Sequence, residues 1–342
     1  MGVLSRAWVP CLRLRKHVAN CHPPIMTLEQ QIKDKALQLG FDAVGITDAS
    51  PIAPADVARF QTWLASGHAG QMQYMHRHLE KRFAPTALLD GTQSVIVAAI
   101  SYKPVPDPRD ASPRDGLLGR VAQYACYDDY HVIIKSLLHE LASFVRAWVQ
   151  EPLRFKVCVD SAPLAERALA VRAGLGFIGL NHTLIHPALG PQVFLGELVT
   201  TARLQADQPV TGGCSSCRRC IEACPAGALQ DDGYLNARKC ISYLTIEHKG
   251  DIDPDLAAGM GDHLFGCDEC ILACPFQEAA PARKNPALRY HPERVGLDLQ
   301  EVLTLYQSSF ETRFGDSPLC RTGLDSLKRN ARICLQNGIQ GR

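Results

Sequence analysis

The sequence of 342 residues lacks the features by which several protein classes are recognised. Its longest apolar run, residues 94–100, is too short to cross a bilayer, which takes about 20 residues. Its net charge of +1 creates no strong overall field toward nucleic acid or a membrane surface. It has no Walker A sequence and no G-x-G-x-x-G loop directly after a strand, so nucleotide triphosphate and dinucleotide sites have no support.

The first 26 residues contain four basic side chains and no acidic one. Such a composition is also found in organellar transit peptides. The segment has no twin-arginine pair and no long apolar core, which argues against an export signal. Because Thr27 starts a sequence typical of a capped helix, we predict that residues 1–26 are a disordered leader. We expect a cytoplasmic protein that binds no membrane and is a monomer.

Cysteine, in contrast, is abundant, with fourteen residues. A disulfide framework is typical of small secreted chains, so metal ligation explains this number better. Residues 214–225 read C-x2-C-x2-C-x3-C-P, the pattern of bacterial ferredoxins, and residues 267–275 repeat it without the first cysteine. Zinc sites also use C-x2-C pairs, but zinc does not explain the third and fourth cysteines and the proline.

Two [4Fe–4S] clusters with crossed ligands follow from this spacing, because the fourth cysteine of each ferredoxin run binds the other cluster. The residue missing from the second run can be supplied by Cys240. The predicted ligands are Cys214, Cys217, Cys220 and Cys274 for the first cluster, and Cys224, Cys240, Cys267 and Cys270 for the second. Most of the other six are expected to be buried apolar residues: Cys11, Cys21, Cys126, Cys158, Cys320 and Cys334.

The rest of the chain divides into an α/β domain, a cluster domain and a helical tail. Alternating strand and helix signals predict the α/β domain over residues 27–205. Its strands are expected at 41–46, 94–100, 155–159 and 192–200, and its helices at 27–39, 130–148 and 163–173. Residues 206–280 form the ferredoxin-like domain. Residues 281–342 form the tail, in which periods at 299–305 and 324–335 resemble a pair of packed HEAT-like helices.

Asp160 is the most informative residue outside the cysteine runs, because it lies between a predicted strand and a predicted helix. Sheets of α/β proteins place their ligands at that edge. The alternative is a helix N-cap, although Ser161 could take that position and leave Asp160 free. In a closed, poorly solvated pocket the pKa of Asp160 would rise, and the side chain could donate a proton.

A family resemblance rests on positions spread from residue 26 almost to the end of the chain. They are Lys81-Arg82, Tyr124-Ala125, Asp129-Tyr130-His131, residues 159–167, 176–181, 184–187 and 194–197, both cysteine runs, and residues 243–248 and 315–331. Together they resemble epoxyqueuosine reductase, an oxidoreductase of queuosine synthesis in tRNA. Tyr127 and the segment 334–338 depart from the family pattern, but neither touches the clusters or Asp160.

The resemblance implies a cobalamin in the α/β domain and an epoxyqueuosine in the anticodon loop of a tRNA as substrate. Electrons from an unidentified external donor would pass through the clusters to cobalamin, and the epoxide would be reduced with loss of water. Asp160 matches the family's proton donor. The implied cobalamin contacts are Arg82, Cys126, Asp160, Asn181, Thr183 and Ile185.

The tail is the predicted tRNA-binding region, since residues 283–342 hold ten Lys or Arg against six Asp or Glu. Proteins read single-stranded loops of RNA, which must be held by their flanking backbone. The candidate holders are Arg313, Arg321, Lys328, Arg329 and Arg332 of the tail, with Lys249 beside the second cysteine run. The alternative for these residues is a solvated helix face.

Two other functions remain at this point. A cobalamin-dependent reductive dehalogenase shares the α/β plan with two clusters, but such enzymes are usually exported. A non-catalytic ferredoxin-type electron-transfer protein would leave Asp160 without a role.

Overall fold

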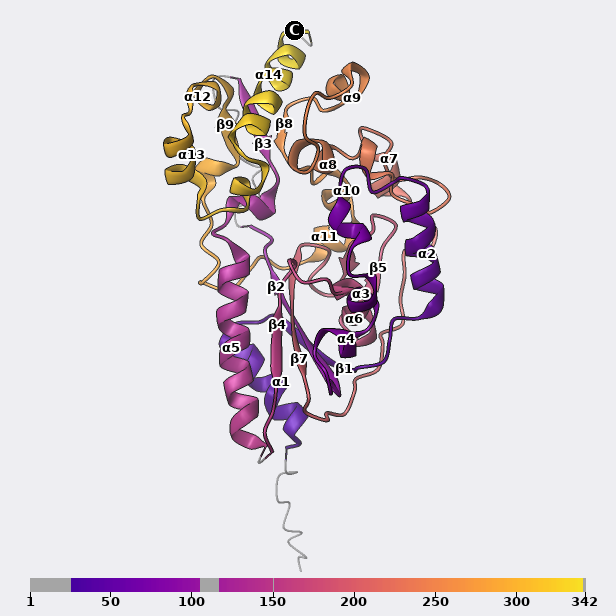
Figure 1. The fold of residues 1–342 in the computed structure, drawn as a ribbon. Coiled ribbons are helices and arrows are strands. Elements are labelled where there is room, and N and C mark those ends of the chain that lie inside the picture. Colours follow the sequence, from indigo (N-terminus) through magenta and orange to yellow (C-terminus); the bar gives the residue numbers. More distant parts are fainter. Residues whose placement is uncertain (1–25, 105–116, 150, 341–342) are drawn as a thin grey trace, which may run out of the picture.

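The computed structural model describes residues 26–104, 117–149 and 151–340 (Figure 1). The predicted leader lies outside these ranges except for Met26, as do Cys11 and Cys21. Within the described ranges, no helix is both long and apolar enough to span a membrane.

A four-stranded antiparallel sheet in the order β1-β2-β7-β4 forms the centre of the N-terminal part. Its strands are β1 (Ala43–Asp48), β2 (Ser94–Ser101), β4 (Phe155–Cys158) and β7 (Val193–Thr200), each within two residues of the prediction. Every residue of β2 is buried, which explains its continuous apolar run. Because the pairing is antiparallel, the ligand-site rule for parallel sheets does not account for the position of Asp160.

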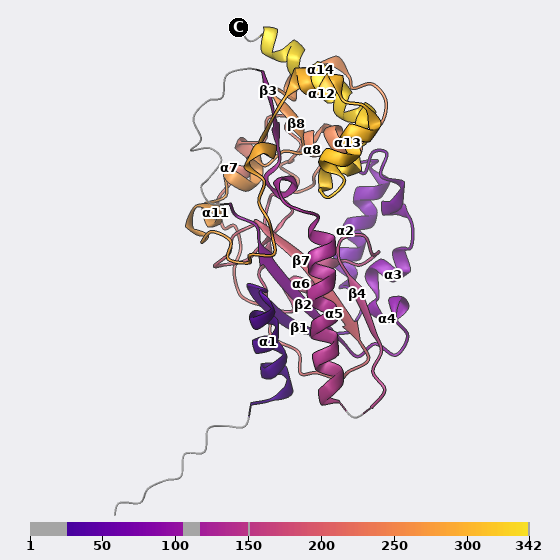
Figure 2. The same cartoon turned by 90° about the vertical axis from the view of Figure 1, so that its left-hand side faces the viewer.

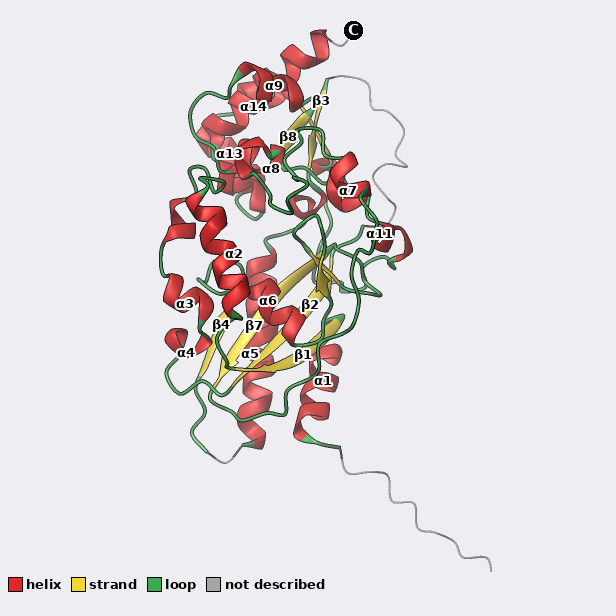
Figure 3. Ribbon diagram, turned by 90° about the vertical axis from the view of Figure 1, so that its right-hand side faces the viewer, coloured by secondary structure: helices red, strands yellow, loops and turns green. Residues whose placement is uncertain are grey.

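Helices cover both faces of this sheet, so the α/β prediction is confirmed. The helices α1 (Leu28–Leu39) and α5 (Tyr130–Trp148) pack side by side on one face, and α6 (Glu166–Arg172) lies on the other (Figures 1 and 3). As predicted, Thr27 caps α1 by accepting the Gln30 N–H, and Gly40 ends it with a φ of 102°.

The helix predicted over residues 163–173 is shorter than expected. It begins at Glu166, and its N-cap residue is Ala165, whose side chain accepts no hydrogen bond. Asp160 and Ser161 lie five and four residues before that cap, in the loop that follows β4. The N-cap interpretation of these two residues is therefore wrong. Asp160 makes no capping hydrogen bond that would hold its side chain away from a ligand.

A second sheet, which the sequence did not predict, joins the N-terminal part to the tail. It has the order β8-β3-β9 and consists of β3 (Leu118–Val121), β8 (His263–Phe265) and β9 (Gly296–Asp298). The predicted tail helices are present as α12 (Leu299–Thr304) and α14 (Leu324–Gln340), with α13 (Gln307–Phe314) between them. Figure 2 shows these helices grouped beside β3 and β8 at the end of the molecule away from α1. The predicted boundaries at residues 205 and 280 are thus crossed by one sheet.

The cysteine-bearing segment is built from short helices. They are α7 (Arg219–Glu222), α8 (Ile241–Ile246), α9 (Pro254–Gly259), α10 (Glu269–Leu272) and α11 (Pro275–Ala279). The hairpin of β5 (Phe177–Ile178) and β6 (Leu184–Ile185) packs against this segment through an apolar cluster that includes Cys274. Gly176 permits this hairpin, because a Cβ there would lie 2.2 Å from the Ile185 carbonyl oxygen.

The remaining elements surround these units. The helices α2 (Pro54–Ala65), α3 (Leu79–Phe83) and α4 (Pro85–Leu88) lie on the same side of the sheet as α6 (Figure 3). Single 3-10 turns are η1 (Gln73–His76), η3 (Gln123–Cys126), η4 (Ala237–Lys239), η5 (Pro292–Arg294) and η6 (Pro318–Thr322).

Candidate active site and iron–sulfur centres

A cavity of about 1210 Å³ opens between α2, the loop after β4, and η6. This volume exceeds the roughly 300–1,000 Å³ of common small-molecule sites. Aromatic and apolar side chains such as Phe60, Tyr130 and Phe194 line it together with charged groups. Asp160, Arg82 and Arg321 are among its lining residues. The predicted proton donor, a predicted cobalamin contact and a predicted RNA contact therefore line the same cavity.

Asp160 lies in this cavity with its backbone in the left-handed region, at a φ of 53°. Its side chain is 48% exposed. One carboxylate oxygen, Oδ2, lies 3.4 Å from His131 Nε2 and 3.7 Å from Arg321 Nη1. Its backbone N–H donates to Glu166 Oε1 at 2.6 Å. The aspartate is therefore anchored through its main chain, and its carboxylate faces two cationic partners.

The pKa of Asp160 is lowered, contrary to the expectation from the sequence. The hydrogen bond with His131 is the main cause, and it outweighs burial, which acts in the opposite direction. The positive charges of His131, Arg321 and Arg167 lower the pKa further. In this arrangement Asp160 is ionised at neutral pH, so a proton that it donates must reach it from a neighbour.

His131, at the start of α5, is the neighbour best placed to hold that proton. Its Nδ1 lies 2.6 Å from Asp129 Oδ1, and its Nε2 faces Asp160. Burial alone would lower the pKa of His131, but the hydrogen bonds to the two aspartates raise it to about 9. No role was predicted for His131, although its motif, Asp129-Tyr130-His131, has a carboxylate two residues before an imidazole.

Two glutamates lie behind the Asp160 loop. Glu166 begins α6, and Glu197 lies in β7 with none of its surface exposed. Burial raises the pKa of Glu197 well above its ordinary range, and the nearby Glu166 carboxyl raises it further. Sequence reasoning assigned no role to Glu197, because an isolated glutamate in a strand carries no local signal of its burial.

The eight predicted cluster cysteines fall into two spatial groups. Burial raises the pKa of Cys274, and the thiols of Cys214 and Cys217 raise it further. Cys220 interacts in the same way with Cys214 and Cys274. In the other group, burial raises the pKa of Cys270, and the thiols of Cys240, Cys267 and Cys224 raise it further. Groups of four thiols that disfavour one another's ionisation are well suited to a cationic iron–sulfur cluster.

The β5–β6 hairpin connects the cavity with both groups of thiols. Ile178 and His182 line the cavity. Between them, the Leu180 N–H lies 3.4 Å from Cys214 Sγ, and Asn181 Nδ2 donates to the Cys270 carbonyl at 3.4 Å. One short segment therefore contacts the cavity and both cysteine runs.

The predicted cobalamin contacts are only partly brought together. Arg82 and Asp160 line the cavity. Asn181 and Thr183 hydrogen-bond to each other in the hairpin, and Ile185 is buried, so these three lie beside the lining rather than in it. Cys126 is fully buried, and its thiol faces the Ala122 carbonyl oxygen at 3.7 Å.

The predicted RNA-binding residues differ in how many hydrogen bonds their charged groups make within the protein. Arg329 donates to the carbonyl oxygens of Leu244, His248 and Gly250, and the Lys249 ammonium donates to that of Thr322. The Arg329 bonds hold α14 against α8 and the loop after it, and the Lys249 bond holds that loop against η6. Both count against a role of Arg329 or Lys249 in phosphate binding.

Other basic residues of the tail remain closer to solvent. Arg313 lies 3.3 Å from Glu301, and Arg321 pairs with Glu247 at 2.6 Å. Arg332 is exposed and Lys328 is partly exposed on the surface of α14. Arg321 also lines the cavity, so it belongs to the active site as much as to the tail.

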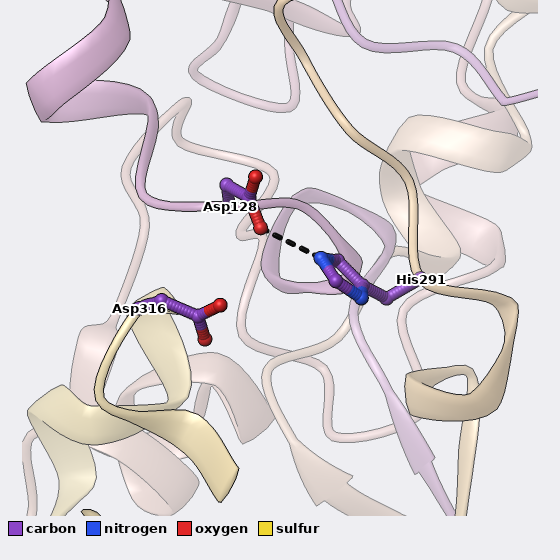
Figure 4. A group of neighbouring side chains, drawn as sticks. All are labelled: Asp128, His291 and Asp316. Carbon is purple, nitrogen blue, oxygen red and sulfur yellow. Dashed lines mark hydrogen bonds and ion pairs between the residues drawn. The ribbon is translucent and has the colours of Figure 1, made fainter. Parts of the chain in front are cut away.

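A separate cluster of potential ligands, Asp128, His291 and Asp316, lies where the start of α5 meets the tail (Figure 4). The His291 ring lies 2.6 Å from Asp128 and 2.9 Å from Glu293. Arg294 pairs with Asp316 at 2.7 Å, so a cation already balances this carboxylate. We interpret the cluster as an ion-pair junction between the two halves of the molecule rather than as a metal centre.

Comparison with known families and proteins gives consistent matches. Residues 82–161 match the family described as epoxyqueuosine reductase QueG, DUF1730, and residues 213–277 match the 4Fe-4S double cluster binding domain. The epoxyqueuosine reductase of Xanthomonas campestris is 37% identical over 90% of this chain and 86% of its own length. That of Escherichia coli is 39% identical over 91% of this chain and 81% of its own.

Solved structures agree with these sequence matches. Epoxyqueuosine reductase from Streptococcus thermophilus has a TM-score of 0.82 at 30% identity, covering 91% of this chain and 82% of that one. An epoxyqueuosine reductase solved with an epoxyqueuosine-modified tRNA-Tyr stem loop gives 0.83 at 30% identity, covering 91% and 81%. A Bacillus subtilis structure, with its catalytic aspartate loop swung out of the active site, gives 0.82 at 28% identity, with the same coverage.

Proposed function

The chain belongs to the epoxyqueuosine reductase family, and we propose that Asp160 and His131 together deliver one of the two protons that its reaction needs. The enzyme reduces epoxyqueuosine to queuosine in tRNA, and its cofactors are two [4Fe–4S] clusters and cobalamin. Converting an epoxide to an alkene with loss of water takes two electrons and two protons. The observation that carries the proposal is the Asp160 carboxylate in the cavity, 3.4 Å from the His131 ring.

Proton delivery follows from the charges around the two side chains. His131 has a pKa of about 9, so its Nε2 carries a proton at neutral pH and faces Asp160 Oδ2. His131 can therefore pass its proton to Asp160, which gives it to the departing oxygen. Asp129, at 2.6 Å from Nδ1, fixes the ring and stabilises its charge. A catalytic aspartate loop is also named for the Bacillus subtilis enzyme.

The cavity fits a large planar cofactor. Its volume, and a lining that combines Phe60, Trp63 and Phe194 with Arg82, suit a ring with apolar faces and polar edges. Arg82 and the hairpin around His182 would hold cobalamin, with Asn181, Thr183 and Ile185 supporting the hairpin from behind. When bound, cobalamin would supply a strongly reducing cobalt centre for the reduction of the epoxide. The protein's part is to hold the substrate, limit access of water and deliver the proton.

The arrangement of the thiols supports the crossed ligand sets proposed for the clusters. Cys274 is grouped with the first cysteine run, and Cys224 and Cys240 with the second. The hairpin contacts from Leu180 and Asn181 to both runs place the cysteines next to the cavity wall. Clusters held by these cysteines would carry electrons from an external donor to the cavity.

The tRNA substrate approaches the cavity beside the tail. At the cavity, Arg321 lies near Asp160 and also pairs with Glu247. It can exchange these two carboxylates for a phosphate of the anticodon loop. Lys328 and Arg332 are proposed to hold the stem through phosphate contacts. Since tRNA is the substrate, we expect the reaction to take place in the cytoplasm.

The direct test is single-turnover reduction of an epoxyqueuosine-containing anticodon stem-loop by the anaerobically reconstituted protein. We expect queuosine in the digested RNA by mass spectrometry only when both cobalamin and a chemical reductant are present. Reduction of a halogenated phenol instead of the RNA would favour a dehalogenase. Intact clusters that bind no cobalamin would favour an electron-transfer protein.

A further inference from the structure

Glu197 is a buried acid that needs a proton to be accommodated. It lies in β7, paired with Val97 of β2 on one side and Cys158 of β4 on the other, and its surface is completely buried. Neither carboxyl oxygen accepts a hydrogen bond from an N–H or hydroxyl group in the described residues. A charged carboxylate without such donors would be very unfavourable in this environment.

The carboxyl that faces Glu197 belongs to Glu166. The two carboxyl groups are close enough to interact. Carboxylates only accept hydrogen bonds, so a hydrogen bond between the two acids requires that one of them carries a proton. Glu197 is the more deeply enclosed of the two and is the favoured site of that proton, because desolvation penalises its charge most.

Glu166 transmits this arrangement to Asp160. Its Oε1 accepts the Asp160 backbone N–H at 2.6 Å. That backbone has a φ of 53°, a conformation that is strained for a residue other than glycine and persists only when its surroundings hold it. The three groups thus form a chain from the centre of the sheet to the residue in the cavity.

We propose that Glu197 is a positioning residue which stays protonated at neutral pH and, through Glu166, holds the Asp160 loop in the conformation that aims its carboxylate at His131 and the cavity. This inference deepens the proposed function, since it rests on Asp160 as the proton donor. Neither glutamate touches the substrate in this role. Their effect on the reaction is entirely through the geometry of Asp160.

The charges around the pair are consistent with one shared proton. Burial raises the pKa of Glu166 to about 7, with the Asp160 charge acting in the same direction and Arg167 against it. Losing the last proton would leave two carboxylates in contact in a buried site. The titratable and charged groups facing the pair from the surrounding elements are Asp160, Arg167, Arg82, Tyr130 and Cys158.

The sign of the pH effect follows from these raised pKa values. Below pH 4.5, the ordinary value for glutamate, the stability that the two protons contribute is fully present. The part due to Glu166 is lost as the pH rises through about 7, and the part due to Glu197, the more deeply buried acid, is lost last. Once Glu197 has lost its proton, the hydrogen bond between the acids breaks, and Glu166 no longer holds the Asp160 N–H in a fixed position. Turnover should therefore decline on the alkaline side.

Three variants of the full, reconstituted enzyme test this. Glu197→Gln keeps a hydrogen-bond donor that does not titrate, so turnover at neutral pH should stay near wild type and the alkaline decline should move to higher pH. Glu197→Leu removes the donor, and kcat should fall by up to ~100-fold with unchanged stem-loop affinity, the scale of a misplaced catalytic group. Glu140→Gln, at an exposed position of α5, is the matched control and should change neither.

Infrared spectroscopy of the same proteins gives a readout that does not need activity. The wild type and Glu140→Gln should show a protonated carboxyl band at neutral pH that is absent from Glu197→Gln. The proposal is overturned if this band is the same in all three, if Glu197→Gln keeps the wild-type pH profile, or if Glu197→Leu turns over normally. Failure of the wild type to reduce the stem-loop would refute the proposed function instead, and the infrared result would still decide whether the pair holds a proton.

Discussion

Replacing Asp160 with asparagine separates proton delivery from every other property of the site. Asparagine has nearly the same size and, like aspartate, tolerates the left-handed backbone found at this position. The backbone N–H that donates to Glu166 is retained. The change therefore removes the ionisable oxygen that faces His131 and leaves the anchoring of the loop intact.

The expected magnitudes differ widely between catalysis and stability. Loss of a general acid typically slows a reaction by ~10²–10⁴-fold, and turnover should fall by that factor. The contribution of the Asp160–His131 pair to the free energy of unfolding is much smaller. The aspartate side chain is 48% exposed, and ion pairs in such surroundings contribute at most about 1 kcal/mol.

The assay is single-turnover reduction of the epoxyqueuosine stem-loop, with Tm and cobalamin absorbance measured on the same preparations. We expect a large loss of rate with nearly unchanged Tm and cofactor binding. A turnover close to that of the wild type would refute the reasoning, since no other carboxylate of the cavity lies so close to His131 in the described residues. A loss of cobalamin together with the rate would show instead that Asp160 mainly holds the cofactor.

Three further outcomes are expected. Cys274→Ser should lower the iron content from about eight toward about four per chain and change the spectrum of the cluster held by the first cysteine run; damage to the other cluster would refute the crossed ligands. Lys328→Ala/Arg332→Ala should weaken stem-loop binding and lower the dependence of its affinity on salt concentration, a slope that falls by roughly 0.7–0.9 per lost contact. An unchanged slope in this double variant would show that α14 is not part of the RNA site. Arg329→Ala, in contrast, should lower Tm. The stability that His131 contributes is fully present below pH 6.5 and lost as the pH rises through about 9, so the Tm difference between wild type and His131→Gln should shrink over that range, and a constant difference would contradict the raised pKa.

Local sequence patterns predicted the elements well where a short segment contains its own signal. The periodicity of residues 130–148 gave the bounds of α5, and Gly40 marked the end of α1 because few other residues adopt its left-handed conformation easily. Sequence periodicity could not show the antiparallel order of the first sheet. The strands β3, β8 and β9 were missed since each has only three or four residues and is defined by distant partners.

The sequence by itself determined the cluster chemistry, because the spacing of thiolates around a cubane is a local property of the chain. It also singled out Asp160, through its motif. Only the tertiary structure placed His131, Arg321 and Glu197 around that aspartate, from three elements that are far apart in the chain. It also showed that Arg329 donates hydrogen bonds within the protein instead of presenting its charge to RNA. The pKa values of such groups depend on burial and on charges brought together by folding, and no pattern along the sequence contains either quantity.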